Sequence, residues 1–147
     1  SLEEYRATVG TFTMDGPELV DSSCVLGVLC TVSLFGTGLS PTNRVLIIGA
    51  NVSCGEQQPW RPYFERLKSE SEVNSRAGDM TSFALGVAVS GVPGDNYQVC
   101  WGQSPVQDSQ YNFVVGRFQM KGPTPSALFC VINTPCYLNV TGVGLQS

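Results

Sequence analysis

The chain has 147 residues, of which 42% are apolar and 14% are charged, and its formal net charge is −4. This composition is typical of a folded globular protein with few charges. The acidic balance argues against a nucleic-acid partner, which needs a clustered basic face. No apolar run reaches the roughly 18 residues of a membrane-spanning helix, so the sequence predicts no membrane span.

Short β patterns recur between turn signals along the chain. The candidate strands are Tyr5–Met14, Cys30–Phe35, Arg44–Ala50, Ser82–Val89, Tyr97–Trp101, Tyr111–Met120 and Cys136–Thr141. In the second of these, alternation predicts Val32 and Leu34 on the inner face. The continuous apolar run Val45–Ile48 is typical of a central strand that is covered on both faces. Six or seven strands in about a hundred residues predict an all-β fold, an immunoglobulin-like antiparallel β-sandwich.

An internal repeat joins the two ends of the sequence. A shift of 106 positions aligns residues 1–41 with residues 107–147 without a gap, and 13 of the 41 pairs are identical. The identical pairs include Tyr5/Tyr111, Gly10/Gly116, Phe12/Phe118, Met14/Met120, Gly16/Gly122, Pro17/Pro123, Cys24/Cys130 and Cys30/Cys136. A period of this length fits an array of whole domains better than a solenoid. A duplication within one domain is the alternative.

The repeat defines the expected domain boundaries. We expect residues 1–17 to form a junction strand shared between modules, and residues 18–120 to form one immunoglobulin-like module. Residues 121–147 would then start the next repeat or complete a partner.

The apolar pattern changes phase at one glycine in each copy. After Gly10 the apolar positions move by one residue, to Phe12 and Met14. Such a change turns the side chains to the other face of a strand, and glycine accommodates the bulge that allows it. Either one strand serves two sheets, ending one module and beginning the next, or a bulge lies within one sheet. The junction residues of the first hypothesis are Gly10, Gly116, Pro17 and Pro123.

The loop Gly55–Asp79 differs from the rest of the chain, because it combines aromatic residues with nine of the twenty charged residues. A short helix over Arg61–Lys68 is one possibility. We expect a solvated crossover loop whose aromatic residues cover one end of the core. A contact surface for a neighbouring subunit or ligand is the alternative, since aromatic residues beside arginine favour interfaces. The candidate interface residues are Trp60, Tyr63 and Phe64.

The sequence contains six cysteines and no histidine, which excludes zinc sites of the Cys/His type. No CxxC pair is present either. The even count favours disulfides formed in an oxidising compartment. Each copy of the repeat carries Cys-x5-Cys, which can close locally as Cys24–Cys30 and Cys130–Cys136. Cys54 and Cys100 remain for a longer bridge, on which Trp101 can pack. Disulfides between chains are the alternative.

Two sequons for N-glycosylation agree with secretion: Asn51-Val52-Ser53 and Asn139-Val140-Thr141. Covalent N-glycans are therefore expected at Asn51 and Asn139, and the Pro-flanked Thr124 and Ser126 are candidates for O-linked sugars. The sequence predicts an extracellular or cell-surface location.

No catalytic constellation is visible. Without histidine, Ser-His-Asp and Cys-His arrangements are impossible, and the sequence holds no phosphate-binding loop or cofactor fingerprint. Glu56, Glu65 and Glu70 lie in a charged loop, where carboxylates are usually solvated. The spacing of Asp15, Asp21 and Asp95 matches no EF-hand loop. We expect no enzyme, no metal and no cofactor.

The run Tyr97-Gln-Val-Cys-Trp-Gly102, followed by Tyr111–Pro123 and by Cys130–Leu145, resembles a known kind of repeat. It is similar to the tandem cysteine-containing immunoglobulin-like repeats of large secreted or cell-surface proteins of protists and algae, some of which build fibrous appendages. Together with the shared glycine strand, which motivates assembly within one polypeptide or by strand exchange between chains, the resemblance favours a structural subunit of an extracellular filament or surface appendage, with copies of itself as partners. It does not cover the loop Gly55–Asp79. An adhesive or recognition stalk that binds a glycan or protein is the alternative.

Overall fold

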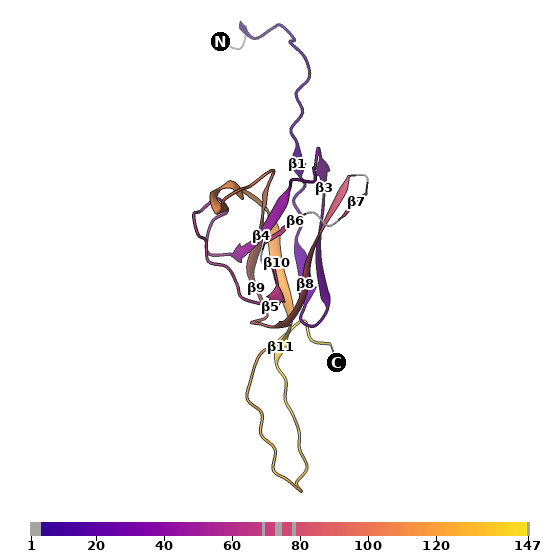
Figure 1. The fold of residues 1–147 in the computed structure, drawn as a ribbon, viewed down its shortest axis with the longest axis vertical. Coiled ribbons are helices and arrows are strands. Elements are labelled where there is room, and N and C mark those ends of the chain that lie inside the picture. The colour runs from indigo at the N-terminus through magenta and orange to yellow at the C-terminus, as the bar shows by residue number, and fades with distance from the viewer. Residues whose placement is uncertain (1–3, 69, 73–74, 78, 147) are drawn as a thin grey trace.

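The computed structural model describes residues 4–68, 70–72, 75–77 and 79–146, and their regular structure consists of short and medium strands (Figure 1). The strands are β1 (Gly16–Pro17), β2 (Ser22–Val25), β3 (Leu29–Thr37), β4 (Arg44–Gly49), β5 (Glu65–Leu67), β6 (Glu70–Glu72), β7 (Ser75–Ala77), β8 (Met80–Ser90), β9 (Gly94–Gly102), β10 (Phe113–Pro123) and β11 (Gly142–Val143). A 3-10 turn, η2, spans Asp108–Gln110. The fold is all-β, as the sequence predicts.

The strands form two sheets. One has the order β1-β3-β8-β5, with β7 also on β8, and the other has the order β11-β10-β9-β4-β6, with β2 beside β10. The described pairings are antiparallel except for β2 and β10, which run parallel from Ser22↔Phe118 to Val25↔Lys121.

Side chains from both sheets meet in one core. The first sheet contributes Val32, Leu34, Phe83 and Leu85, and the second contributes Val45, Ile47, Val99, Val115, Phe118 and Met120. The inward positions of Val32 and Leu34 are therefore those that alternation predicts. Burying each such side chain stabilises the fold by about 1.5–3 kcal/mol.

A second, smaller cluster lies on the opposite face of β4 and β9. It contains Leu46, Ile48, Cys100 and Tyr111, with Val52 and Cys54 packed against it. Val45–Ile48 is thus buried on both faces of its sheet, which explains the continuous apolar run in the sequence.

Two predicted strands are wrong. The segment Tyr5–Met14 contains no strand, and Figure 1 shows it leading away from the body of the molecule. Cys136–Thr141 is not a strand either, and only the adjacent β11 pairs with β10. Both segments have a strand-like pattern, but a strand forms only where another strand takes up its backbone hydrogen bonds.

The proposed helix at Arg61–Lys68 is also wrong. This stretch contains β5, which pairs with β8 through Glu65↔Ser90 and Leu67↔Gly86. Between these pairs Arg66 has a φ of 66°, a left-handed conformation that interrupts the ladder. Residues 69, 73–74 and 78 of the predicted loop lie outside the described residues, as do residues 1–3 and 147.

Candidate functional site

The first candidate site is the junction at the end of β10. From Phe113 to Met120 this strand pairs with β9, whereas its last residues form the pairs Gly122↔Val143 and Pro123↔Gly142 with β11. One uninterrupted strand therefore serves two sets of partners. In Figure 1 a long hairpin-like segment extends beyond this junction, away from the two sheets.

The same arrangement exists at the start of the module, meaning the two packed sheets from β1 to β10. β1 pairs with the end of β3 through Gly16↔Thr37 and Pro17↔Gly36, which are the pairs of β10 and β11 shifted by 106 positions. The next hydrogen bond is also repeated: Glu18 N–H donates to Phe35 O and Thr124 N–H to Thr141 O, both at 2.7 Å. The two copies thus share the backbone pairing around residues 16–18 and 122–124.

Glycines make this geometry possible in both copies. A methyl group on Gly36 would lie 2.7 Å from Pro17 Cα, and one on Gly142 would lie 2.8 Å from Pro123 Cα. No side chain fits at such distances, so the backbones approach closely only because both positions are glycine.

Three disulfides form within the chain, in the pairs that the repeat favours: Cys24–Cys30, Cys54–Cys100 and Cys130–Cys136. The first joins β2 to β3 and so ties the two sheets together. Its turn has Gly27 at a φ of 82°, and the turn of the third has Asn133 at 66°. Asparagine is among the few non-glycine residues that tolerate this conformation, so the turn between Cys130 and Cys136 can adopt it without glycine.

The two copies differ in burial. Phe118 is 0% exposed in the core, whereas Phe12 is 84% exposed. Val32 is 1% exposed, and its counterpart Leu138 is 56% exposed. The apolar side chains that the module buries are therefore exposed in the segments that precede and follow it.

The phase change at Gly116 is a bulge inside one sheet. The β10–β9 register shifts between Val114 and Gly116. A methyl group on Gly116 would lie 2.7 Å from the carbonyl carbon of Val20, whose N–H donates to Val115 O at 3.0 Å. Of the two interpretations of the sequence pattern, the structure therefore has the bulge within one sheet at Gly116. The strand changes partners further on, at Gly122–Pro123. Gly10 lies in the segment before β1, which contains no strand.

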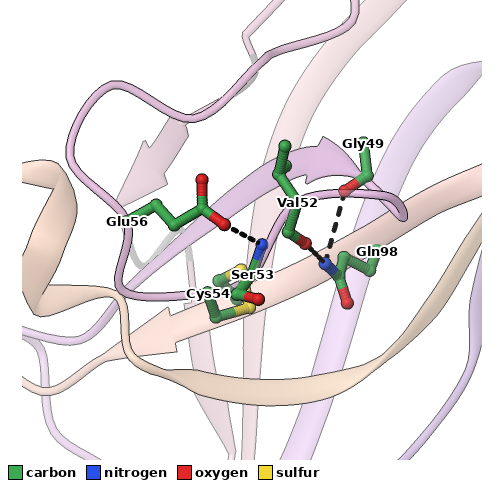
Figure 2. Close-up of a disulfide and its surroundings, with 7 residues drawn as sticks. Gly49, Val52, Ser53, Cys54, Glu56 and Gln98 are labelled. Atoms are coloured by element: carbon green, nitrogen blue, oxygen red, sulfur yellow. Dashed lines mark hydrogen bonds between the residues drawn. A yellow bond between two sulfur atoms is a disulfide. The ribbon is translucent and has the colours of Figure 1, made fainter.

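The second candidate site is the outer face of β4 and β9, which the loop after β4 covers (Figure 2). Cys54 in this loop is joined to Cys100 in β9. Gln98 Nε2 donates to Val52 O at 2.5 Å and to Gly49 O at 3.3 Å, and Ser53 N–H donates to Glu56 Oε1 at 2.7 Å. These contacts hold the first sequon in a fixed loop.

Trp101 does not pack on this bridge, contrary to expectation. It packs against the main core instead, edge-to-face with Phe113 at 6.3 Å. Neighbouring residues of a strand point to opposite faces, so Cys100 and Trp101 cannot share one side of the sheet. The buried Trp101 Nε1–H has no hydrogen-bond partner among the described residues.

The three aromatic residues of the loop have different roles. Trp60 and Tyr63 are exposed, but Phe64 is only 4% exposed and belongs to the core. Phe64 packs edge-to-face on Tyr97 at 5.4 Å, so it covers the end of the core and cannot act as an interface residue. The Trp60 ring is nearly parallel to that of Tyr97, with the centroids 6.5 Å apart.

Tyr97 anchors this end of the module. Its hydroxyl donates to Val92 O at 2.8 Å, across the connection between β8 and β9. Burial raises the pKa of Tyr97 above its ordinary value, because the charged phenolate is poorly solvated there.

An open hollow of about 670 Å³ lies beside these rings, lined by Ala50, Asn51, Trp60, Asn96 and Tyr97. The sequon residue Asn51 and the exposed ring of Trp60 both line it, and sequence reasoning did not predict that they lie close together. The pairing Gly49↔Tyr97 between β4 and β9 brings the residues together.

The remaining predicted residues stay apart or take structural roles. Glu56 accepts the Ser53 N–H bond, and Glu65 accepts a hydrogen bond from Ser90 Oγ at 3.0 Å. The side chain of Asn139 is exposed, as are those of Thr124 and Ser126. Across the ranges that the structure describes, no three His, Cys, Asp or Glu side chains gather as a metal site requires.

None of the described residues forms a helix that is long and apolar enough to cross a membrane. Comparisons with protein-family models, with curated proteins and with solved structures found no match to this chain.

Proposed function

We propose that this chain is a structural subunit of an extracellular filament or surface appendage, built from immunoglobulin-like modules that pass a strand from one to the next. The observation that carries the proposal is the path of β10, which changes partners from β9 and β2 to β11 and pairs at Gly122–Pro123 in the geometry with which the module itself begins. Such a connection contains no linker, so neighbouring modules would be held in a fixed orientation.

Strand order supports an immunoglobulin-like β-sandwich. The sheet β1-β3-β8-β5 corresponds to the A-B-E-D sheet of that fold, and β10-β9-β4 corresponds to G-F-C. The bond from Tyr97 to Val92 O resembles the tyrosine corner at the E–F connection. The chain departs from antibody domains in its disulfides, because none joins the two central strands β3 and β9.

Three disulfides and two exposed sequon asparagines support an extracellular location, since disulfides persist in oxidising compartments. A role without catalysis is part of the proposal. The carboxylates of Glu56 and Glu65 accept hydrogen bonds from the Ser53 N–H and the Ser90 hydroxyl, which are structural contacts within the fold.

The proposal is tested by the assembly of the full chain, followed by analytical ultracentrifugation and negative-stain electron microscopy. We expect end-to-end chains of particles, because a second copy can cover the apolar residues that each copy exposes at its two ends. Such a head-to-tail contact does not close on itself and gives linear polymers. Phe12→Asp, at a position that is 84% exposed, should abolish assembly without unfolding the module.

Val106→Asp is the matched control, since Val106 is 88% exposed in the connection between β9 and β10 and is not part of either exposed terminal segment, 5–14 or 124–141. It should leave assembly unchanged. Particles that stay single at every concentration, or assemblies that survive Phe12→Asp, would contradict assembly through these ends.

The hollow supports a second candidate function, an adhesive module that binds a glycan. Trp60 is 57% exposed beside the amide side chains of Asn51 and Asn96, a combination suited to a sugar ring. This function predicts saturable binding of a free glycan that Trp60→Ala abolishes.

A further inference from the structure

We propose that the first sugar of an N-linked glycan on Asn51 packs against the Trp60 ring, so that the glycan forms part of the folded surface over β4 and β9. The inference rests on the extracellular location proposed above, because N-glycans are added to proteins that enter the secretory route. It is independent of how the modules assemble.

The geometry around Gly49 brings the two side chains together. A methyl group on Gly49 would lie 2.7 Å from Asn51 Oδ1 and 2.7 Å from Trp60 Cε3. The carboxamide that carries a sugar and the indole ring therefore flank one point on the end of β4. The attached sugar would begin its path beside the ring.

Backbone hydrogen bonds fix both walls of the hollow. Gly49 N–H donates to Trp60 O at 3.0 Å, and Ala50 N–H donates to Asn96 O at 2.8 Å. On the following residues, the Cys54–Cys100 disulfide and the bonds from Gln98 hold the loop on the sheet (Figure 2). A sugar that binds here meets a prearranged surface and need not order the loop first.

The hollow has the chemistry of a sugar site. Its volume of about 670 Å³ exceeds that of one hexosamine ring, and its wall combines the rings of Trp60 and Tyr97 with the amide of Asn96. The C–H groups on one face of a sugar carry partial positive charge and meet the negative face of an indole ring, while the hydroxyls can reach the amide.

Attachment favours the protein's own glycan over a free sugar. A sugar tethered to Asn51 has an effective concentration of about millimolar or higher at Trp60, whatever the surrounding solution contains. In the attachment step the Nδ2 atom of Asn51 bonds to the anomeric carbon of an N-acetylglucosamine carried on a lipid pyrophosphate. The bond from that carbon to the pyrophosphate oxygen breaks, Nδ2 loses one proton, and the lipid pyrophosphate leaves.

The test compares melting temperatures of the full chain secreted from eukaryotic cells, after mass spectrometry has measured occupancy of Asn51. We expect Asn51→Gln to lower the melting temperature by about 4 °C. Protein trimmed to a single N-acetylglucosamine should keep the value of the untrimmed protein, because only the first sugar contacts the ring. In a Trp60→Leu background, Asn51→Gln should cause no further decrease.

Two controls separate packing from other effects. Trp60→Phe keeps an aromatic ring and should preserve most of the difference between glycosylated and unglycosylated protein. Asn139→Gln removes the other glycan, whose exposed asparagine lies outside the module core, and should leave the melting temperature unchanged. The proposal would be overturned if Asn51 carried no glycan. It would also be overturned if Asn51→Gln lowered the melting temperature equally in the wild type and in the Trp60→Leu background.

A titration distinguishes the two sources of sugar. Unglycosylated chain from a bacterial periplasm, mixed with N-acetylglucosamine or chitobiose, should show no saturable change in tryptophan fluorescence at millimolar concentrations. Saturable binding that Trp60→Leu abolishes would overturn the proposal in favour of glycan recognition. Neither outcome depends on the Phe12→Asp assembly experiment, so failure of one proposal is distinguishable from failure of the other.

Discussion

Residues 5–38 and 111–144 are two copies of one sequence pattern, but they contribute opposite halves to the folded module. The first copy provides its second half, from β1 to β3, and leaves residues 5–14 exposed. The second copy provides its first half, in β10, and leaves most of residues 124–141 exposed. The backbone pairing at Gly16–Pro17 and Gly122–Pro123 is the same in both copies, whereas strand formation and burial in the rest of each copy depend on which strands lie alongside. Glycines therefore allow the same close pairing at both junctions, and partner strands determine where the remaining residues form strands and become buried.

The largest expected difference in stability is between substitutions of Phe118 and Phe12, which occupy equivalent positions in the two copies. Phe118→Ala removes a fully buried ring and should lower the free energy of unfolding of the module by about 4 kcal/mol. Phe12→Ala changes an exposed residue and should alter it by less than about 0.5 kcal/mol. Urea denaturation of both variants, monitored by tryptophan fluorescence, measures the contrast. Similar losses would show that residues 5–14 are packed in solution.

A smaller difference is expected between the two local disulfides. Cys24→Ala/Cys30→Ala releases a tie between the two sheets, and the loop-entropy model for a separation of 6 residues gives a loss of about 2 kcal/mol. Cys130→Ala/Cys136→Ala should leave unfolding of the module unchanged, because that disulfide lies outside the core. Thermal unfolding of the two double variants checks this, and equal decreases would mean that residues 124–141 contribute to the module.

The smallest expected effect on the free energy of unfolding concerns Tyr97, which lies in the buried core of the module. Tyr97→Phe removes the hydrogen bond to Val92 O and should cost about 1 kcal/mol. Because burial raises the pKa of Tyr97, its contribution is fully present below the unfolded pKa of about 10 and is lost as pH rises through the higher folded pKa. The free energy of unfolding should therefore fall above about pH 10 in the wild type, and less in Tyr97→Phe. Parallel curves for the two proteins would rule out Tyr97 as the cause.

Sequence patterns predicted the module's principal strands because alternation and apolar runs report burial directly. They could not show that Tyr5–Met14 and Cys136–Thr141 lack neighbours, since pairing depends on residues far away in the sequence. β5 was missed because it has three residues, two of them charged, and Arg66 in a left-handed conformation.

The candidate site was less predictable than the fold. The repeat was sufficient to suggest the disulfide pairs, because each Cys-x5-Cys unit closes locally. The hollow forms only when β4 pairs with β9, which places Asn96 beside the loop that carries Asn51 and Trp60. No local pattern encodes a contact between residues so far apart in sequence. The positions of Cys100 and Trp101 on opposite faces, however, could have been read from strand alternation.

The parallel pairing of β2 with β10 has a mechanical consequence. The chain enters the second sheet in β2, and its last long strand, β10, runs beside β2 in the same direction from Ser22↔Phe118 to Val25↔Lys121. Tension applied to the two ends of the module would pull these strands past each other along their length. All the bonds between them would then bear the load together in shear, and could not break one at a time as they do when a strand is peeled from an edge.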